Sequence, residues 1–553
     1  MRDRITVSVI QHRLGGIVQE MGEVMLRTAY SQILNSSRDF STSVFDGKGR
    51  LVAQAEHIPI HVGALPAAVA AVCEAFPNRI EPGDLFILND PYHGGSHLPD
   101  VTILRPIFVD ADLVFWAVTR AHHADIGGAT HGGYNSAATE IWQEGLRITP
   151  LKLRARGEVR DDILQFLAVN VRHGRDFLGD LDAMIGSTTI AERRLLRLVD
   201  EYGAATIAEV IDAILDSAER QARACIETWR DGVFQGESAL DDDGHGAVDV
   251  HVRATVTKTG AGLLVDLSRS DAQVAGFINS SWPNTVSAVH MALAYLIDPE
   301  VPKNEGTFRP VGLKAKQGTV VWPNAPAPVT MCTAHCGQEI AEAVIKALSQ
   351  SCPDRAVAGW SKRFRIAIRG VDPRTSRPFI WHLFHARGGG GASPAGDGWA
   401  LAGGVITGGG VKFGSIEVSE VRAPLYFERH EFRADSGGAG KFRGGTGGVL
   451  ELLIETQEPA VANTAGDGIR HAPYGLFGGE PGATHSNRLI SRGETRLLRT
   501  KEVGVPILPG DRLIVESSGG GGYGPPSERD PRSLEADLRD ALVTARAPAA
   551  TTR

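Results

Sequence analysis

The first 160 residues alternate between helical and extended patterns of hydrophobic positions. Apolar residues recur every three to four positions over 7–34, which predicts an amphipathic helix. Alternating positions on either side of Asp46-Gly47 predict a β-hairpin over 43–53. A short helix is expected over 66–76, and strands are expected over 84–88 and 113–119. These elements indicate an α/β region at the start of the chain.

The pattern changes beyond residue 158. Segments 161–171, 180–202 and 205–230 combine helical spacing with many charged residues and few glycines, which predicts a mainly helical section. Val-x-Val alternation predicts strands within 248–266. Helices follow over 284–296 and 338–350, and short β-like runs fill 420–516. A last helix is expected over 534–543, before a tail of small residues that we expect to be flexible.

These patterns predict a multi-domain α+β protein of mixed α/β character. A chain of 553 residues is too long for one hydrophobic core. We expect an N-terminal α/β region with the candidate site (1–157), a mainly helical section (158–247), a central α/β region (248–419), a β- and glycine-rich region (420–530), and a C-terminal helix with a flexible tail (531–553). The 65 glycines gather in runs such as 388–391, 437–448 and 519–524. Because the runs lack a three-residue period, they indicate tight backbone turns rather than collagen.

Charge and composition exclude several classes of function. The formal net charge is −8 and no block of Lys and Arg stands out, so we expect neither nucleic acid nor a membrane surface as a partner. Five cysteines do not form a disulfide framework, and no secretory apolar segment opens the chain, so we expect a cytoplasmic protein. No phosphate-binding loop occurs, and the glycines at 519–524 precede two prolines rather than a helix. We therefore assign no nucleotide-binding residue.

Histidines cluster in the N-terminal region. Seven of the 18 histidines lie within 75 residues, where an even spread would give about two or three. They are His57, His61, His93, His97, His122, His123 and His131. This clustering favours a functional site over scattered core or surface histidines.

The candidate ligands lie in short, separate segments. The loop Asn89–Asp100 places His97 and Asp100 three residues apart, on either side of Pro99, while Asp39 precedes the loop and His122 follows it. Two imidazoles and two carboxylates suit an open site for a divalent metal, which can prepare a water for attack on a carbonyl. Adjacent side chains on an extended backbone point to opposite faces, so only one of His122 and His123 should bind.

Other polar residues are candidates for supporting roles. Arg38 could keep the Asp39 carboxylate ionised, or it could be a surface arginine. His57 and His61 could orient a ligand or grip substrate, with buried polar packing as the alternative. We assign His123 and Asp125 as candidates for proton transfer. The motif Cys332, His335 and Cys336 lacks a second matching pair, so we interpret it as structural.

At these residues the sequence resembles the hydantoinase B/oxoprolinase family. The similarity extends through about residue 526 and is carried by 37–41, 54–61, 89–102, 121–128, 302–310 and 432–445. It implies an ATP-dependent cyclic amidase built from two kinds of subunit. A partner A-type subunit would bind ATP and phosphorylate the carbonyl of a lactam or cyclic imide. This B-type chain would carry one divalent metal, zinc in preference to manganese, that promotes hydrolysis of the activated ring.

Transferred by position, the resemblance implies Asp39, His97, Asp100 and His122 as the metal ligands. It also implies a hetero-oligomer with self-association. The chain departs from the family's pattern near 331–336 and 403–414, which allows a substrate other than hydantoin or 5-oxoproline. Two alternatives remain at this point. One is a component of an ATP-dependent ketone carboxylase of the acetone or acetophenone type, and the other is a non-catalytic scaffold with a structural metal.

Overall fold

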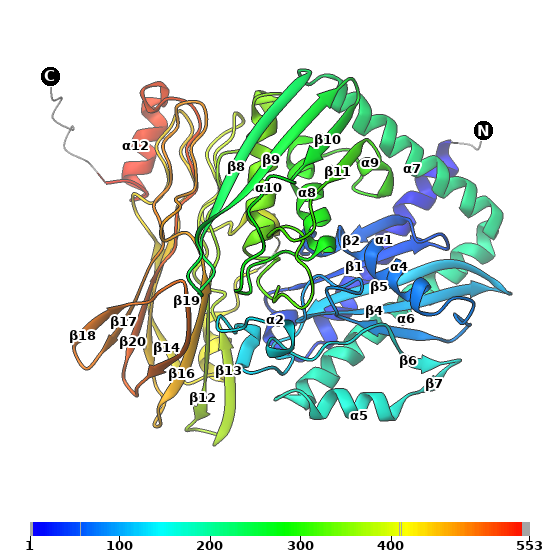
Figure 1. The fold of residues 1–553 in the computed structure, drawn as a ribbon, viewed down its shortest axis with the longest axis horizontal. Coiled ribbons are helices and arrows are strands. Elements are labelled where there is room, and N and C mark those ends of the chain that lie inside the picture. The colour runs from blue at the N-terminus through cyan, green and yellow to red at the C-terminus, as the bar shows by residue number, and fades with distance from the viewer. Residues whose placement is uncertain (1–3, 56, 409, 411, 545–553) are drawn as a thin grey trace. The chain divides into compact units, whose positions relative to one another are not determined.

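The computed structural model describes residues 4–55, 57–408, 410 and 412–544. These residues form two compact units. The first contains the described residues of 1–239, 243–353 and 406–414, and the second those of 240–242, 354–405 and 415–553. Helices and strands occur in both parts of the chain, as expected of an α+β protein (Figure 1). Each helix of the described chain is too short or too polar to cross a lipid bilayer.

The predicted helices are present, with shifted ends. The α-helices are α1 (Arg4–Thr28), α2 (Gln32–Asn35), α3 (Pro59–Val62), α4 (Leu65–Ala75), α5 (Asp161–Val169), α6 (Gly174–Tyr202), α7 (Ala204–Glu227), α8 (Trp282–Leu296), α9 (Glu305–Phe308), α10 (Cys336–Ser349), α11 (Ile416–Arg422) and α12 (Pro531–Arg539). The helix expected over 7–34 ends at Thr28, because the backbone N–H groups of Tyr30 and Ser31 donate to the Asp180 carboxylate and turn the chain. The expected tail beyond residue 544 lies outside the described residues.

The first unit is built on a seven-stranded sheet in the order β2-β1-β5-β4-β3-β6-β7. Its strands are β1 (Phe40–Asp46), β2 (Leu51–Ala55), β3 (Leu85–Leu88), β4 (Asp100–Val109), β5 (Asp112–His122), β6 (Leu151–Ala155) and β7 (Glu158–Val159). The expected hairpin is β1–β2, which pair antiparallel. Asp46 accepts hydrogen bonds from the N–H groups of Lys48 and Arg50 at 3.0 and 2.9 Å and stabilises the turn.

Strand alternation divides the apolar residues of this sheet between two cores. Phe115 and Ala117 face a core with α1, α6 and α7, while Trp116 and Val118 face a core with α4. Helices therefore cover both faces, and the sheet is rigid enough to hold side chains at its strand ends. A four-stranded sheet in the order β11-β10-β9-β8 follows, with β8 (Gly232–Asp242), β9 (Val248–Thr259), β10 (Gly262–Asp266) and β11 (Val311–Lys314).

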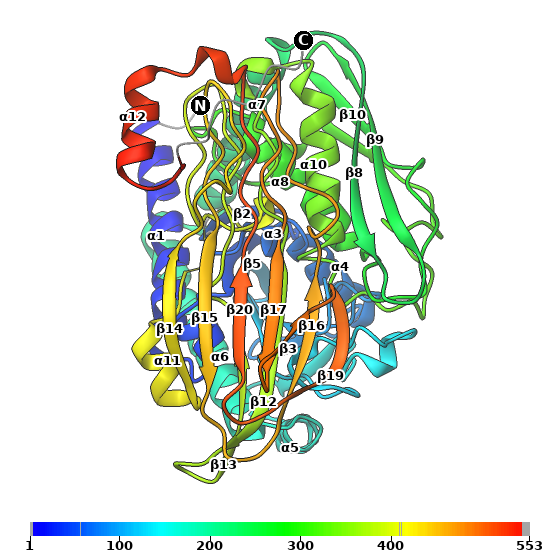
Figure 2. The same cartoon turned by 90° about the vertical axis from the view of Figure 1, so that its left-hand side faces the viewer.

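The second unit contains two antiparallel sheets that share one hydrophobic core (Figure 2). Their orders are β13-β12-β16-β19 and β14-β15-β20-β17-β18. The strands are β12 (Phe364–Asp372), β13 (Arg377–His382), β14 (Leu425–Phe432), β15 (Gly448–Ile454), β16 (Ala460–Gly466), β17 (Ser486–Ser491), β18 (Glu494–Leu497), β19 (Lys501–Ile507) and β20 (Arg512–Glu516). Ile366 and Trp381 from one sheet pack with Leu450 and Leu513 from the other.

The glycine runs of the second unit lie against one another. A Cβ atom added at Gly520 would lie 1.9 Å from the carbonyl oxygen of Gly390, and one added at Gly444 would lie 1.9 Å from that of Gly520. The N–H groups of Gly520 and Gly445 donate to the carbonyls of Gly445 and Gly390, each at 2.9 Å. The expected tight backbone is therefore a set of segments in direct backbone contact, where a side chain has no room.

Candidate metal centre

Three neighbouring strands of the first sheet place polar residues at one edge. Asp100 opens β4 and His122 closes β5, and these two residues are paired across the strands. Asp39 immediately precedes β1, and its carbonyl accepts a hydrogen bond from the His122 N–H at 3.0 Å. Residues paired across antiparallel strands present their side chains on the same face. The sheet therefore brings together side chains that are more than 80 positions apart along the chain.

His97, Asp100 and His122 form a group of potential metal ligands. One ligand atom from each lies within 4.8 Å of the others, and all three residues are buried. The Asp100 Oδ1 atom lies 2.8 Å from His97 Nε2 and 3.1 Å from His122 Nδ1. The Nε2 atoms of both histidines are buried without a hydrogen bond. Two buried nitrogens without hydrogen bonds beside a carboxylate fit a bound cation of the zinc or manganese type.

The loop before β4 is held in place by Asn89. Its side-chain amide donates to the carbonyl of Leu98 at 2.7 Å, and its Oδ1 atom accepts from the Ile148 N–H at 2.7 Å. A Cβ at Gly95 would lie 2.1 Å from the Asn89 carbonyl, so this position requires glycine. These contacts of the loop Asn89–Asp100 therefore fix the backbone on which His97 stands.

Asp39 and His61 lie next to the three-residue group. The His61 Nε2 atom, on α3, lies 3.4 Å from Asp100 Oδ2 and 3.6 Å from Asp39 Oδ1. Burial lowers the pKa of His61, against the opposing effect of the two carboxylates. Burial acts to raise the pKa of Asp100, but His61, His97 and His122 together hold it well below its usual range. Asp100 is therefore an ionised carboxylate surrounded by imidazoles.

His123 and Asp125 lie apart from this group in their contacts. The His123 ring packs against Phe177 on α6, with ring centroids 4.6 Å apart, as expected if adjacent side chains point to opposite faces. Burial lowers the His123 pKa to about 4. Asp125 is paired with Arg172 at 2.8 Å and also accepts hydrogen bonds from the N–H groups of Arg172 and Gly127. These contacts tie Asp125 to the segment before α6, and its role in proton transfer stays a prediction.

Arg38 and His57 have other surroundings. Arg38 has a left-handed backbone (φ 57°) and, among the described residues, forms no ion pair with Asp39. The His57 ring packs on Phe40, with centroids 4.5 Å apart, and a Cβ at Gly22 would lie 2.5 Å from its Nε2 atom. Burial and then Arg38 lower the pKa of His57. Arg38 lies two residues before the start of β1, and His57 packs on Phe40, the first residue of β1.

Glu144 and Thr330 are positioning residues that the sequence did not reveal. The Nδ1–H group of His97 donates to the Thr330 carbonyl, which leaves Nε2 to face Asp100. Glu144 accepts hydrogen bonds from the N–H groups of Val329 and Thr330 at 2.9 and 2.8 Å. Burial raises the Glu144 pKa to about 7. Glu144 thus holds the peptide segment that orients His97, as outer partners of metal-binding histidines do.

Replacing Glu144 with alanine should weaken metal binding by about ten- to a hundredfold, because the segment that orients His97 loses its anchor. Glu144→Gln keeps one carbonyl acceptor and should recover part of the affinity. Competition with a chromophoric chelator measures both constants. Glu140→Ala, in the same segment and only half-buried, is the control. Equal metal affinity in Glu144→Ala and the unmodified chain would contradict this role.

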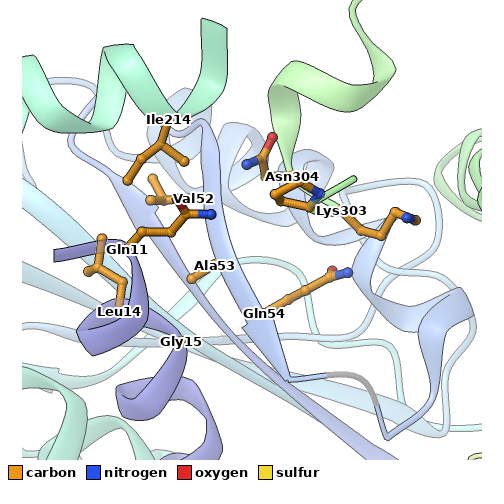
Figure 3. A pocket seen from close by; sticks show the side chains of 10 residues that line it. Gln11, Leu14, Gly15, Val52, Ala53, Gln54, Ile214, Lys303 and Asn304 are labelled. Atoms are coloured by element: carbon orange, nitrogen blue, oxygen red, sulfur yellow. The ribbon is translucent and has the colours of Figure 1, made fainter. Parts of the chain in front are cut away.

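A separate cavity of about 220 Å³ borders β2. Side chains from α1, β2, α7 and residues 302–304 surround it (Figure 3). Gln11, Gln54, Lys303 and Asn304 are its polar residues, and among the described residues that line it there is neither a carboxylate nor an imidazole. The described residues of this lining therefore offer no group that could bind a catalytic metal or transfer a proton near pH 7.

A sequence model of the hydantoinase B/oxoprolinase family matches residues 3–526. The chain belongs to this family. It is 35% identical to the β subunit of caprolactamase from Pseudomonas jessenii, over 98% of this chain and 94% of that one. It is also 29% identical to the B-type subunit of a putative D-/L-hydantoinase from Pseudomonas sp. strain NS671, over 98% and 93%. The 5-oxoprolinase 1 of Arabidopsis thaliana is 28% identical, with 42% of its length covered.

Two solved structures have the same fold as this member of the family. The ATP-dependent caprolactamase from P. jessenii superposes with a TM-score of 0.92 at 35% identity, covering 98% of this chain and 95% of that one. A nucleotide-free acetone carboxylase gives a TM-score of 0.88 at 20% identity, with coverage of 98% and 78%. The family prediction made from the short N-terminal motifs is confirmed.

Proposed function

We propose that this chain is the metal-dependent B-type subunit of an ATP-dependent cyclic amidase that opens a lactam or cyclic imide ring. The observation that carries the proposal is the buried His97–Asp100–His122 group, in a chain 35% identical along nearly its whole length to a caprolactamase β subunit. We propose Asp39 as a fourth ligand, because its carboxylate approaches the same His61 nitrogen as Asp100 does.

Each residue of the site would have a distinct role. When bound, a divalent cation would stabilise negative charge on the carbonyl oxygen and lower the pKa of a water. His97 and His122 would hold it through their Nε2 atoms, and Asp100 would contribute its negative charge. His61 is placed to exchange a proton at Nε2, since it lies within 3.6 Å of both carboxylates. His61 therefore joins His123 and Asp125 as a candidate for proton transfer.

A partner protein would supply ATP. An unactivated amide is a poor electrophile, so phosphorylation of the carbonyl by an A-type partner would precede hydrolysis here. The chain contains no phosphate-binding loop of its own, which is consistent with this division. The β and B designations of the caprolactamase and hydantoinase relatives support such a partner.

The test is an assay of the chain purified together with its ATP-binding partner. Caprolactam, hydantoin and 5-oxoproline are each supplied with ATP, and NMR follows ring opening while ADP release is measured. We expect one cyclic amide to open only when ATP and both proteins are present. Product that forms only with bicarbonate, without ring opening, would instead identify a carboxylase. A site closed by four protein ligands, with metal but no turnover on any substrate, would favour the structural scaffold.

A further inference from the structure

A small cavity in the second unit is lined by an excess of positive charge. Lys362, Arg363, Arg365 and Arg387 line it, together with apolar residues and glycines, and the described residues of the lining include no carboxylate. Lys362 and Arg387 are each more than nine-tenths buried. Four cationic residues around one small cavity create a positive potential that attracts an anion.

Arg365 is the decisive residue of this cavity. It lies on β12, it is 8% exposed, and its Nε and Nη1 atoms are buried without a hydrogen bond. Its guanidinium packs over the Phe384 ring, 4.7 Å from the centroid, and forms no ion pair among the described residues. Removing a charged guanidinium from water without a partner costs several kcal/mol. The free donors point to a ligand that accepts hydrogen bonds and carries negative charge.

The size and charge of the cavity restrict that ligand. Its volume is about 20 Å³, too small for a nucleoside. A guanidinium fork matches the oxygens of a phosphate or a carboxylate. Four cationic residues around one cavity favour the doubly charged phosphoryl group over a singly charged carboxylate. We propose that this cavity binds the phosphoryl group of a phosphorylated small substrate, or the inorganic phosphate released from it. The identity of that substrate as a phosphorylated cyclic amide rests on the proposed function.

Calorimetric titration of the full chain with inorganic phosphate tests the site. The titration needs neither metal, partner nor turnover, so its outcome is independent of the hydrolase proposal. We expect saturable binding that weakens by about ten- to a hundredfold in Arg365→Met. Arg369→Met is the matched control, because Arg369 lies on the same strand but is exposed. This variant should bind phosphate with the same affinity as the unmodified chain.

A melting experiment separates a binding role from a structural one. In phosphate-free buffer, Arg365→Met should raise the melting temperature, because it removes a buried charge that has no partner. Phosphate should raise the melting temperature of the unmodified chain and of Arg369→Met, but not that of Arg365→Met. Arg365→Lys keeps the charge but loses the fork, so it should bind phosphate several-fold more weakly with no gain in melting temperature.

The following results would overturn the proposal. They are the absence of phosphate binding, an equal loss of binding in Arg369→Met, a lower melting temperature of Arg365→Met in phosphate-free buffer, and acetate binding as tight as that of phosphate at equal ionic strength. ADP binding more tightly than phosphate would also contradict it, because the source of the phosphoryl group would then be a nucleotide.

Discussion

Replacing His97 with alanine or Asp100 with asparagine will remove the bound metal and lower ATP-coupled ring opening by about 1,000-fold or more. His97 contributes a buried nitrogen without a hydrogen bond, and Asp100 contributes the charge that both imidazoles approach. A metal stabilises the charge of the transition state by several kcal/mol, and loss of that stabilisation corresponds to a fall in rate of about 1,000-fold. Elemental analysis of the purified variants measures the metal, and the NMR assay measures turnover.

The matched control for these variants is His93→Ala. His93 stands in the same loop, but its side chain is about half exposed and pairs with Asp90 at 2.9 Å rather than with the group. Its metal content and rate should remain near those of the unmodified chain. Co-purification with the partner should be unaffected in all three variants. Full metal content in both His97→Ala and Asp100→Asn would refute the ligand assignment and, with it, the proposed hydrolytic role.

A single methyl group at Gly520 should destabilise the second unit by about 3 kcal/mol or more. The Cβ of Gly520→Ala would lie 1.9 Å from the Gly390 carbonyl oxygen, a backbone atom that cannot move without breaking the bonds around it. Differential scanning calorimetry should show an earlier transition or no folded second unit. Gly262→Ala is the control, because its nearest atom would be 3.7 Å away. An unchanged melting profile for Gly520→Ala would show that these segments separate easily.

The helices could be predicted from the sequence because their apolar positions follow one face. Helix α7 was expected over 205–230 and spans Ala204–Glu227. Strand β4 was not predicted, and it contains Pro106, a residue that normally argues against a central strand. Strand β3 pairs with β4 only over Thr102–Leu104, so Pro106 lies where β4 has a partner on one side only. Strand β4 therefore forms through pairing with its neighbouring strands, which cannot be predicted from local sequence propensity.

The sequence grouped His97 with Asp100 because these two residues share one loop. Asp39 and His122 lie in separate segments and were added from the clustering of polar residues and the family resemblance, whereas the pairing of Asp100 with His122 across β4 and β5 is seen only in the structure. The contact between His97 and Thr330 joins residues 233 positions apart, and no local motif marks either Thr330 or Glu144. Arg365 was missed for the same reason, because an arginine in a strand is ordinary until its surroundings are known.

The hydrogen bond from His97 to Thr330 has a consequence for synthesis of the chain. Every proposed ligand is made within the first 122 residues, yet the carbonyl that orients His97 is added only at residue 330. A nascent chain could therefore bind a cation early, while the His97 imidazole is still free to rotate. The orientation of His97 would become fixed only after some 200 further residues had left the ribosome. Metal selection during translation would then occur in two stages, loose acquisition followed by tightening.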